Sequence, residues 1–258
     1  MRMRRWGREY DAELRDRYNT ITTGLGSRIN DIVEGRVAPA VEDIAIGSAR
    51  KLEAAVLFFD IRQFTAWSGD PSDEGLRRAL LILDCVIPMM MHVLHDCDAY
   101  VEKNTGDGVM AIFPASGNGS DAVNAALSAA PRMFYAITHI VNPSLAAVGL
   151  GPIKARIGID YGAVLIARIG VASGTARLGR NALVAVGPPA NIACRLQTAA
   201  GTNEILIGNA VYMLASARRK GFCKAATPAD WSWVTNGTAV PYWVWRYGAE
   251  MLDPDEMS

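Results

Sequence analysis

An α+β fold, with helices covering a largely antiparallel sheet, is predicted by three features of this sequence. Apolar runs of strand length alternate along the chain with longer segments whose apolar residues recur at helical spacing. Two of the strand-like runs are separated only by "TGDG" (105–108), whose glycines permit the tight turn of an antiparallel hairpin. Half of the 258 residues are hydrophobic, which suffices for one substantial core. We therefore expect one main domain with extensions.

The first part of the chain should hold a helical extension, a buried strand and a long helical segment. Residues 1–50 are rich in charged residues and helix formers and are interrupted by glycines and a proline, which predicts one or two helices and a linker. The run "AAVLFFDI" (54–61) is apolar throughout, as is typical of a strand buried on both faces. Residues 71–97 have helical spacing and a Ser/Asp start, but Pro88 should kink this helix or split it in two.

A hairpin, a helix and a second pair of strands should follow. The runs on either side of the glycine turn, 99–104 and 109–113, form the hairpin. Residues 117–141 combine a capping start with helical composition. The stretch "IKARIGIDYGAVLIARIG" (153–170) is interpreted as two strands that turn near Gly162.

The last part of the chain should add a helix, a strand, another helix and a terminal hairpin. "GPPANIACRLQTAA" predicts a helix that begins near Pro189, because proline suits the first helical turn. Residues 203–215 predict a short strand and a helix, and the tryptophan-rich remainder predicts a β-hairpin around "TNGT" (235–238). This order of elements fits a ferredoxin-like core most economically, with 51–214 as the main domain and 215–258 completing it.

The composition argues against several classes of partner. Lys plus Arg number 26 and Asp plus Glu number 26, so no basic field is available to hold a nucleic acid. The four cysteines show no paired spacing, which suits reduced thiols in the cytoplasm. The most apolar segment, "LLILDCVIPMMMHVL", is interrupted by Asp84 and Pro88 and is shorter than the roughly 20 residues that a membrane span needs. We expect a cytoplasmic protein that binds neither nucleic acid nor membrane.

Two acidic residues stand where strands are predicted to end. Asp60 ends the first buried run, and Asp107 lies at the tip of the hairpin. If the hairpin lies beside the first strand, the two carboxylates converge, and convergent carboxylates bind hard divalent cations that keep open positions for phosphate oxygens. Phosphoryl or nucleotidyl transfer is the chemistry that this indicates. "GDG" is also an ordinary turn sequence, so the spacing alone leaves both interpretations open.

Four ordered motifs, "VLFFDIRQFT", "VEKNTGDGVMAIF", "RIGIDYG" and "VGPPANIACRLQ", resemble those of the catalytic domain of class III nucleotidyl cyclases. The resemblance extends from about Ala54 to Gly208. It implies a homodimer with active sites at the subunit interface. It also implies that Asp60, Ile61 and Asp107 hold two divalent ions per site, Mn²⁺ or Mg²⁺.

The same resemblance implies which residues contact the nucleotide. The turn after the first acid, which includes Phe64 and Thr65, would hold the triphosphate through its backbone amides. Asn191 and Arg195, four residues apart on one helix face, match the family's ribose-positioning Asn and its transition-state Arg. The implied reaction is attack of the ribose 3′-oxygen on the α-phosphorus with loss of pyrophosphate. Charge then builds on phosphate oxygens, where metal ions and a guanidinium stabilise it.

One phosphate-binding position departs from the family pattern. Many members carry a Lys in the C-terminal hairpin, and the nearest counterpart in this chain is Thr235. Lys224 and Arg246 are the alternatives for this role.

The base-binding positions depart as well. Adenylate-forming members pair a Lys with an Asp or Thr, and here the Lys is Lys103 while the partner position is Val184. A Lys ammonium only donates hydrogen bonds, and Val offers no polar group, so the amino group of adenine would lose its acceptor. Uracil presents its O4 acceptor to Lys103 and leaves the rest of the pocket to apolar groups. Donor matching therefore favours UTP, then ATP, then CTP and GTP.

A narrower resemblance agrees with that order. The single-domain layout, the helical lead-in and the tryptophan-rich tail are similar to the pyrimidine cyclases of bacterial Pycsar antiphage systems. This resemblance implies an enzyme that converts UTP to 3′,5′-cyclic UMP (cUMP) and pyrophosphate as an antiviral signal for a separate effector protein. Cytidylate cyclase, adenylate cyclase and a nucleotide-binding domain without turnover remain as alternatives.

Overall fold

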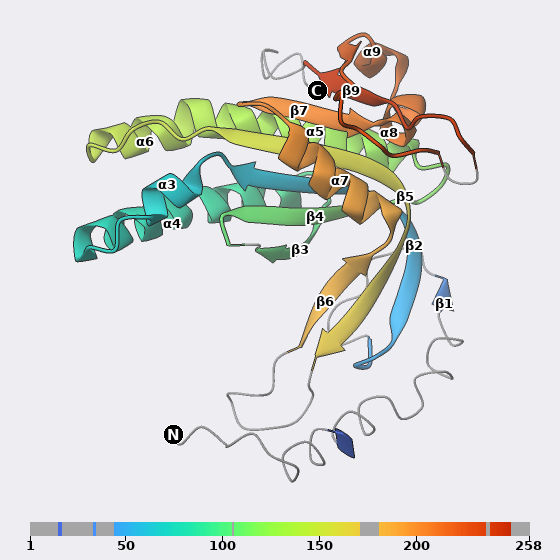
Figure 1. Ribbon diagram of the computed structural model, residues 1–258, viewed down its shortest axis with the longest axis horizontal. Coiled ribbons are helices and arrows are strands. Elements are labelled where there is room, and N and C mark those ends of the chain that lie inside the picture. Colours follow the sequence, from blue (N-terminus) through green and yellow to red (C-terminus); the bar gives the residue numbers. More distant parts are fainter. Residues whose placement is uncertain are drawn as a thin grey trace.

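The computed structural model describes residues 15–16, 33–34, 44–104, 106–170, 181–235 and 238–248. These residues form one mixed sheet with helices on both faces (Figure 1). The strands are β1 (Val33–Glu34), β2 (Ala49–Ile61), β3 (Tyr100–Asn104), β4 (Gly108–Pro114), β5 (Ala155–Gly170), β6 (Asn181–Val186), β7 (Glu204–Gly208), β8 (Cys223–Ala225) and β9 (Val244–Tyr247). The helices are α3 (Phe64–Ser68), α4 (Asp73–His95), α5 (Ser120–Ala136), a π-helical turn (Ile137–Val141), α6 (Asn142–Ala147), α7 (Pro188–Ala199), α8 (Asn209–Leu214) and α9 (Ala217–Lys220).

The strand order agrees with the predicted ferredoxin-like core. Along its main path the sheet runs β3-β4-β2-β5-β7-β9-β8, with β1 beside β2 and β6 beside β5. The unit β2–α4–β3–β4–α5–β5 contributes the first four strands of that path, and its strand pairs are all antiparallel. Parallel pairs occur between β1 and β2 and between β5 and β7. The sheet is therefore mixed but largely antiparallel.

Two helical layers bury opposite faces of the sheet. Successive side chains of a strand point to opposite faces, and β2 shows this alternation directly. Leu57 and Phe59 belong to the large core that includes residues of α4 and α5, whereas Val56 belongs to the second core that includes Ala193 of α7. The same alternation places Asp60, at the end of β2, on the α7 face.

Helix α4 is continuous through Pro88, so of the two effects predicted for this proline, a kink or a split, the split does not occur. Its start is conventional, because the side chain of Ser72 accepts a hydrogen bond from the backbone N–H of Gly75 at 3.0 Å. Pro88 lies inside the helix and removes one intrahelical N–H. Val86 and Met90, on either side of it, are fully buried against the sheet. Burial of that apolar face offsets the lost hydrogen bond.

The same helix is long and apolar enough to cross a membrane by length and composition alone, with a mean hydropathy of 1.5 over its best window. About a third of that window is buried inside the structure, and the large apolar residues Leu76, Leu80, Leu81 and Met91 are exposed. Ile82, Val86, Met90 and Leu94 form one stripe that is fully buried in the core against the sheet. This stripe is the pattern of a helix packed on a sheet.

The stretch that was expected to turn near Gly162 is one uninterrupted strand, β5, and the predicted hairpin there was wrong. Gly162 has φ 154°, a conformation that favours glycine, yet it remains paired with Ala54 of β2. Pairing with β2 continues on both sides of it, because β2 is itself 13 residues long and offers a partner along its whole length.

Strand β6, from "NALVAV", was not predicted from the sequence. It pairs with the C-terminal part of β5, and Val184 lies opposite Ala167. Figure 1 shows that β6 and the adjoining part of β5 extend away from the layer formed by β3, β4 and β7. We call β6 and the part of β5 that pairs with it, residues 165–170, the arm.

The predictions for the C-terminal and N-terminal segments have different outcomes. At the C-terminus the predicted hairpin is present in part: β8 and β9 pair, β9 also pairs with β7, and one bridge between Val234 and Pro241 brackets the "TNGT" loop. Of the N-terminal extension, residues 15–16 are helical and β1 pairs with β2. The rest of the predicted helical segment in 1–50 up to Asp43 lies outside the described residues.

Candidate active site

The structure brings Asp60 and Asp107 together, as the sequence predicted. Asp60 lies opposite Gly108 in the β2–β4 ladder, so the turn that holds Asp107 is adjacent to the end of β2. The backbone N–H of Ile61 donates to the carbonyl oxygen of Asp107 at 3.1 Å, which ties the turn to the strand. The negative charge of Asp107 contributes to a raised pKa of Asp60.

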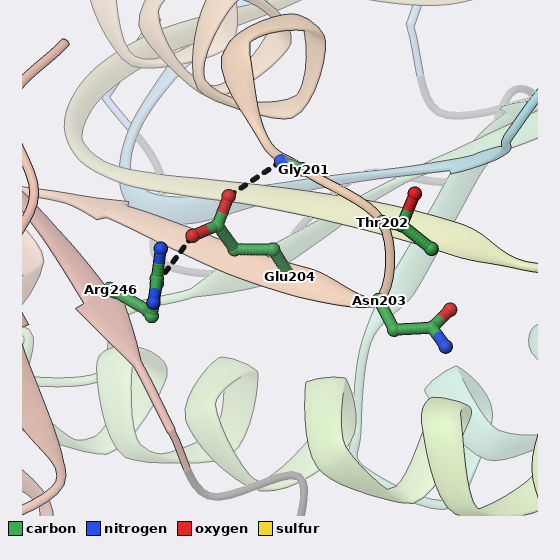
Figure 2. A pocket seen from close by; sticks show the side chains of 5 residues that line it. All are labelled: Gly201, Thr202, Asn203, Glu204 and Arg246. Carbon is green, nitrogen blue, oxygen red and sulfur yellow. Dashed lines mark hydrogen bonds and ion pairs between the residues drawn. The ribbon is translucent and has the colours of Figure 1, made fainter.

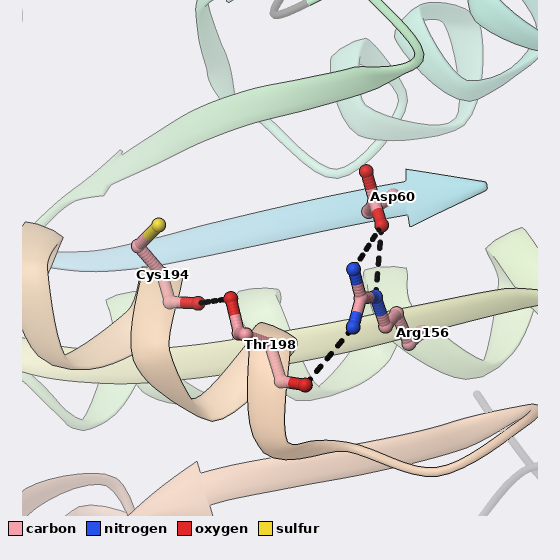
Figure 3. Close-up of polar contacts among 4 residues, drawn as sticks. All are labelled: Asp60, Arg156, Cys194 and Thr198. Atoms are coloured by element: carbon pink, nitrogen blue, oxygen red, sulfur yellow. Dashed lines mark hydrogen bonds and ion pairs between the residues drawn. The ribbon is translucent and has the colours of Figure 1, made fainter. Parts of the chain in front are cut away.

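An arginine that sequence reasoning missed lies against the first acid. Nε and Nη2 of Arg156 each lie 2.8 Å from Oδ2 of Asp60, and Nη1 donates to the carbonyl oxygen of Thr198 at 2.9 Å (Figure 3). Arg156 stands directly opposite Asp60 in the β2–β5 ladder. A basic residue inside the apolar run "ARIGID" was the available signal, but its meaning depended on this register.

Burial is the main reason that the pKa of Asp60 is raised. The hydrogen bond and positive charge of Arg156 act in the opposite direction and lower it, while the charge of Asp107 raises it further. The amide of Gln197, on α7, also lowers this pKa. Nε2 of Gln197 is nevertheless buried and completes no hydrogen bond of good geometry within the described residues. The site thus holds an anionic pair, a cation and an amide with unused donor capacity.

Helix α7 carries the two residues that the family resemblance assigned to the ribose and the transition state. It begins at Pro188, as predicted. It packs so closely on β5 that a Cβ added to Gly158 would overlap the backbone carbonyl oxygen of Ala193. Asn191 and Arg195 lie one turn apart on this helix and are exposed. Their exposure leaves both side chains available to a ligand or to a second chain.

The turn expected to hold the triphosphate is only partly available. The backbone N–H groups of Ile61 and Arg62 already donate to carbonyl oxygens of neighbouring segments. The Ile61 side chain has no ligand atom, so its backbone oxygen is the group that could bind a metal ion, and the residue as a whole is 1% exposed. Phe64 and Thr65 begin the short helix α3, with Thr65 exposed and Phe64 packed against the core. The backbone N–H of Ala66 already donates to the carbonyl oxygen of Gln63 at 2.9 Å, which leaves those of Phe64 and Thr65 as the first-turn donors.

The two base-binding candidates lie on strands that touch each other. Lys103 is on β3, where its backbone pairs with Met110, and its side chain lies outside the described residues. Val184 is half-buried on β6. Contacts between β3 and β6 bring the two strands together in space.

The three candidates for the phosphate-binding cation lie in two places. Arg246 forms an ion pair with Glu204 beside a pocket of about 290 Å³ (Figure 2). Lys224 and Arg246 also line a neighbouring pocket of about 460 Å³ near the C-terminal end of α7. Thr235 lies elsewhere, two residues after Trp233, whose ring faces Arg195. Thr235 is therefore on the segment that contacts the proposed transition-state residue.

The acid pair has the chemistry of a divalent metal site. Within the described residues no three His, Cys, Asp or Glu side chains come together, so any ion would be held by two carboxylates and backbone or substrate oxygens. Two neighbouring carboxylates are stabilised by a shared cation. Few protein ligands leave positions open for phosphate oxygens. The residues present therefore fit Mg²⁺ or Mn²⁺.

Comparisons with known proteins agree with this geometry. The chain is 27% identical over 165 residues to an adenylate cyclase of Anabaena cylindrica, a match covering 62% of this chain and 30% of the relative. It is 27% identical over 138 residues to a cytidylate cyclase of Staphylococcus aureus, covering 52% of this chain and 31% of the relative. The chain thus spans about a third of the length of these relatives.

A solved cyclase structure shares this fold over nearly the whole length of the solved chain. The adenylyl cyclase CyaB from P. aeruginosa superposes with a TM-score of 0.60 at 23% identity, covering 77% of this chain and 95% of that one. In addition, residues 46–231 match the adenylate and guanylate cyclase catalytic domain. That match includes both acids, Arg156 and all of α7, and it shows that the chain belongs to the adenylate and guanylate cyclase catalytic domain family.

Proposed function

We propose that this protein is a homodimeric nucleotidyl cyclase that converts UTP to cUMP and pyrophosphate. The observation that carries the proposal is the convergence of Asp60 and Asp107 at the end of β2, on the sheet face that α7 covers. Family membership supports cyclisation of a nucleoside triphosphate. The choice of UTP rests on Lys103 and Val184.

The residues around the acids divide the work of binding the triphosphate. Asp60, Asp107 and the backbone oxygen of Ile61 would hold two divalent ions, which when bound neutralise phosphate charge and favour ionisation of the 3′-hydroxyl. Arg156 shares Oδ2 of Asp60 and is a second cation at the same point. Its Nε and Nη2 contact Asp60 and its Nη1 donates to the carbonyl oxygen of Thr198, so Arg156 would hold the Asp60 carboxylate in place for the metal ions. The first-turn amides of α3, at Phe64 and Thr65, are oriented donors for the same charge.

Helix α7 supplies the groups that act on the sugar and on the developing charge. The Asn191 side chain offers both a donor and an acceptor to the ribose, which fixes the 3′-oxygen for attack. The Arg195 guanidinium donates to the α-phosphate oxygens, where charge increases in the transition state. An interaction that strengthens in the transition state raises kcat.

The separation of the two half-sites supports a dimer. Val184 pairs with Ala167, which lies eleven residues along β5 from Arg156, the partner of Asp60. That is about 36 Å measured along the strand. The arm in Figure 1 also carries β6 away from the layer with the acids. The resemblance to class III cyclases implies that the acids of one subunit face the base-binding residues of the other, and the distance along β5 between Val184 and the acid site supports that arrangement.

Hydrogen-bond matching at the base favours uracil. Lys103 only donates, and the half-buried Val184 cannot accept, so uracil leaves the fewest polar groups unpaired. An unsatisfied buried group costs about 1–3 kcal/mol, or roughly tenfold to a hundredfold in selectivity. UTP should outcompete ATP by that margin. Val184→Asp should shift the preference toward ATP, because its carboxylate accepts from the adenine amino group.

Two other bases have specific support. Similarity to the cytidylate cyclase of Staphylococcus aureus supports CTP as the alternative pyrimidine substrate. Similarity to the adenylate cyclase of Anabaena cylindrica supports ATP. A cyclase-like domain that binds nucleotide without turnover is the remaining alternative. It has no evident use for Asp60, Asp107, Asn191 and Arg195 together. In the uridylate cyclase we propose, cUMP is a cytoplasmic signal to a separate effector protein in antiphage defence.

The test is incubation of the purified protein with each of the four ribonucleoside triphosphates and Mn²⁺, followed by identification of products by mass spectrometry. We expect cUMP and pyrophosphate, with cUMP formed fastest from an equimolar mixture. Faster formation of cAMP would contradict the donor argument at Lys103. Faster formation of cCMP would retain a pyrimidine cyclase but contradict that use of Lys103. No cyclic product from any triphosphate would contradict the enzyme assignment.

A further inference from the structure

The guanidinium of Arg195 lies over an aromatic ring from a distant part of the chain. Its Cζ is 5.6 Å from the centroid of the Trp233 ring, within the range of a cation–π interaction. Arg195 is exposed on α7, and within the described residues no hydrogen bond or ion pair fixes its guanidinium. A long exposed side chain with no such contact samples many rotamers. The ring of Trp233 is thus the group that restricts the side chain of Arg195.

The ring that faces Arg195 is itself held in place. Trp233 is half-buried and packs against a small core that includes Ile192 and Leu196 of α7, so helix and ring share one apolar cluster. The backbone N–H of Tyr242 donates to the carbonyl oxygen of Trp233 at 2.9 Å. In return, Nε1 of Trp231 donates to the carbonyl oxygen of Tyr242 at 2.9 Å. The segment that carries the ring is therefore held by hydrogen bonds to the segment that leads into β9.

Tyr242 connects this segment to the centre of the sheet. Its hydroxyl donates to Oδ1 of Asp160 at 2.6 Å and accepts from the backbone N–H of Ala210 at 3.0 Å. Asp160 lies on β5 and is 1% exposed. A chain of contacts thus runs from a buried carboxyl, through Tyr242 and Trp233, to an exposed Arg. The buried end of this chain of contacts is fixed in the sheet, so it can hold the Trp233 ring in place against the exposed guanidinium of Arg195.

We propose that Trp233 is a positioning residue, which holds the Arg195 guanidinium in the orientation that contacts the α-phosphate. The inference rests on the proposed function, since Arg195 is assigned to the transition state there. A fixed guanidinium loses less rotamer freedom when charge develops, so the contact should affect kcat more than KM. An exposed cation–π contact corresponds to about a two- to fivefold change in rate.

The test is a double-mutant cycle on kcat and KM. Trp233→Leu keeps an apolar side chain but removes the ring face, and it should lower kcat about two- to fivefold with KM within about twofold. Trp233→Phe keeps a ring and should recover part of the loss. In an Arg195→Ala background, Trp233→Leu should have no further effect. Trp243→Leu is the matched control, because Trp243 is 50% exposed and lies outside the contact.

Two measurements separate positioning from a loss of folding. Thermal unfolding of each variant shows whether Trp233→Leu destabilises the chain, and Trp233→Phe remains testable if it does. The fluorescence of Trp233, obtained by subtracting the spectrum of Trp233→Phe, should change when Arg195 becomes Ala, since the guanidinium then leaves the ring. An unchanged Trp233 emission would contradict the contact.

The outcomes distinguish this inference from the proposed function. An equal loss of kcat from Trp233→Leu in the presence and absence of Arg195 would overturn the positioning role while leaving the cyclase intact. A kcat of Trp233→Leu at or above the wild-type value would also overturn it, because the ring would then be idle or would hold Arg195 away from the substrate. Absence of cyclic product from the wild type overturns the proposed function itself.

Discussion

At the scale of single residues, the acid pair makes the sharpest prediction. Replacing Asp60 or Asp107 by Asn removes one anionic oxygen ligand but little packing, so cyclic product should fall below detection while the fold is retained. Product analysis with Mn²⁺, together with circular dichroism and thermal unfolding, checks both parts. Retained activity in Asp60→Asn would contradict the assignment of the two acids to the metal.

Asp160 makes a second prediction, on stability against pH. Burial raises its pKa to about 7, while the hydrogen bond from Tyr242 acts in the opposite direction. Between pH of about 4 and 7 the folded protein therefore keeps a proton that the unfolded chain releases. The free energy of unfolding should fall as pH rises through this window, by at most about 1.4 kcal/mol per pH unit, and level off above it.

Substitution isolates this contribution. Asp160→Asn keeps the shape but cannot titrate, so its free energy of unfolding should rise relative to that of the wild type as pH increases from 4 to 7. Urea unfolding at several pH values measures the difference. Tyr242→Phe removes a hydrogen bond that lowers the pKa of Asp160, and it should extend the window to higher pH. Parallel curves for wild type and Asp160→Asn would contradict the raised pKa.

At the scale of secondary-structure elements, the close packing of α7 on β5 is the feature to test. In Gly158→Ala the new Cβ would overlap the backbone of α7 at Ala193 and Gln197, so the helix must move away from the sheet. We expect a destabilisation of about 1–3 kcal/mol in urea unfolding. We also expect a fall in kcat, because the helix carries Asn191 and Arg195.

Gly117→Ala is the matched control for this change. A Cβ at Gly117 meets nothing within 4 Å, so its stability and kcat should stay close to those of the wild type. If Gly158→Ala behaved like Gly117→Ala, the position of α7 would not depend on that contact.

At the scale of the whole molecule, the proposed dimer predicts complementation between two chains of greatly reduced activity. Asp107→Asn removes a metal-binding acid, and Arg195→Ala removes the cation that the resemblance to class III cyclases assigns to the other subunit's half of the site. If each active site combines both subunits, a heterodimer of these variants regenerates one intact site. Activity of the mixture should approach about a quarter of the wild-type value, because half of randomly formed dimers are mixed and each has one site. Differently tagged chains allow the heterodimers to be isolated. Purified heterodimers without activity would contradict a shared site.

The sequence alone determined the features that depend on local pattern. The hairpin around "TGDG" and the start of α7 at its prolines followed from turn chemistry and capping. The convergence of Asp60 with Asp107 depended in addition on the pairing of β4 with β2. The tertiary structure decided what depends on a partner strand. It kept β5 extended through Gly162, because β2 supplies hydrogen bonds on both sides, and it placed Arg156 on Asp60 through strand register. It also placed Trp233 over Arg195, since a contact between residues far apart in the chain is fixed by packing rather than by local propensity.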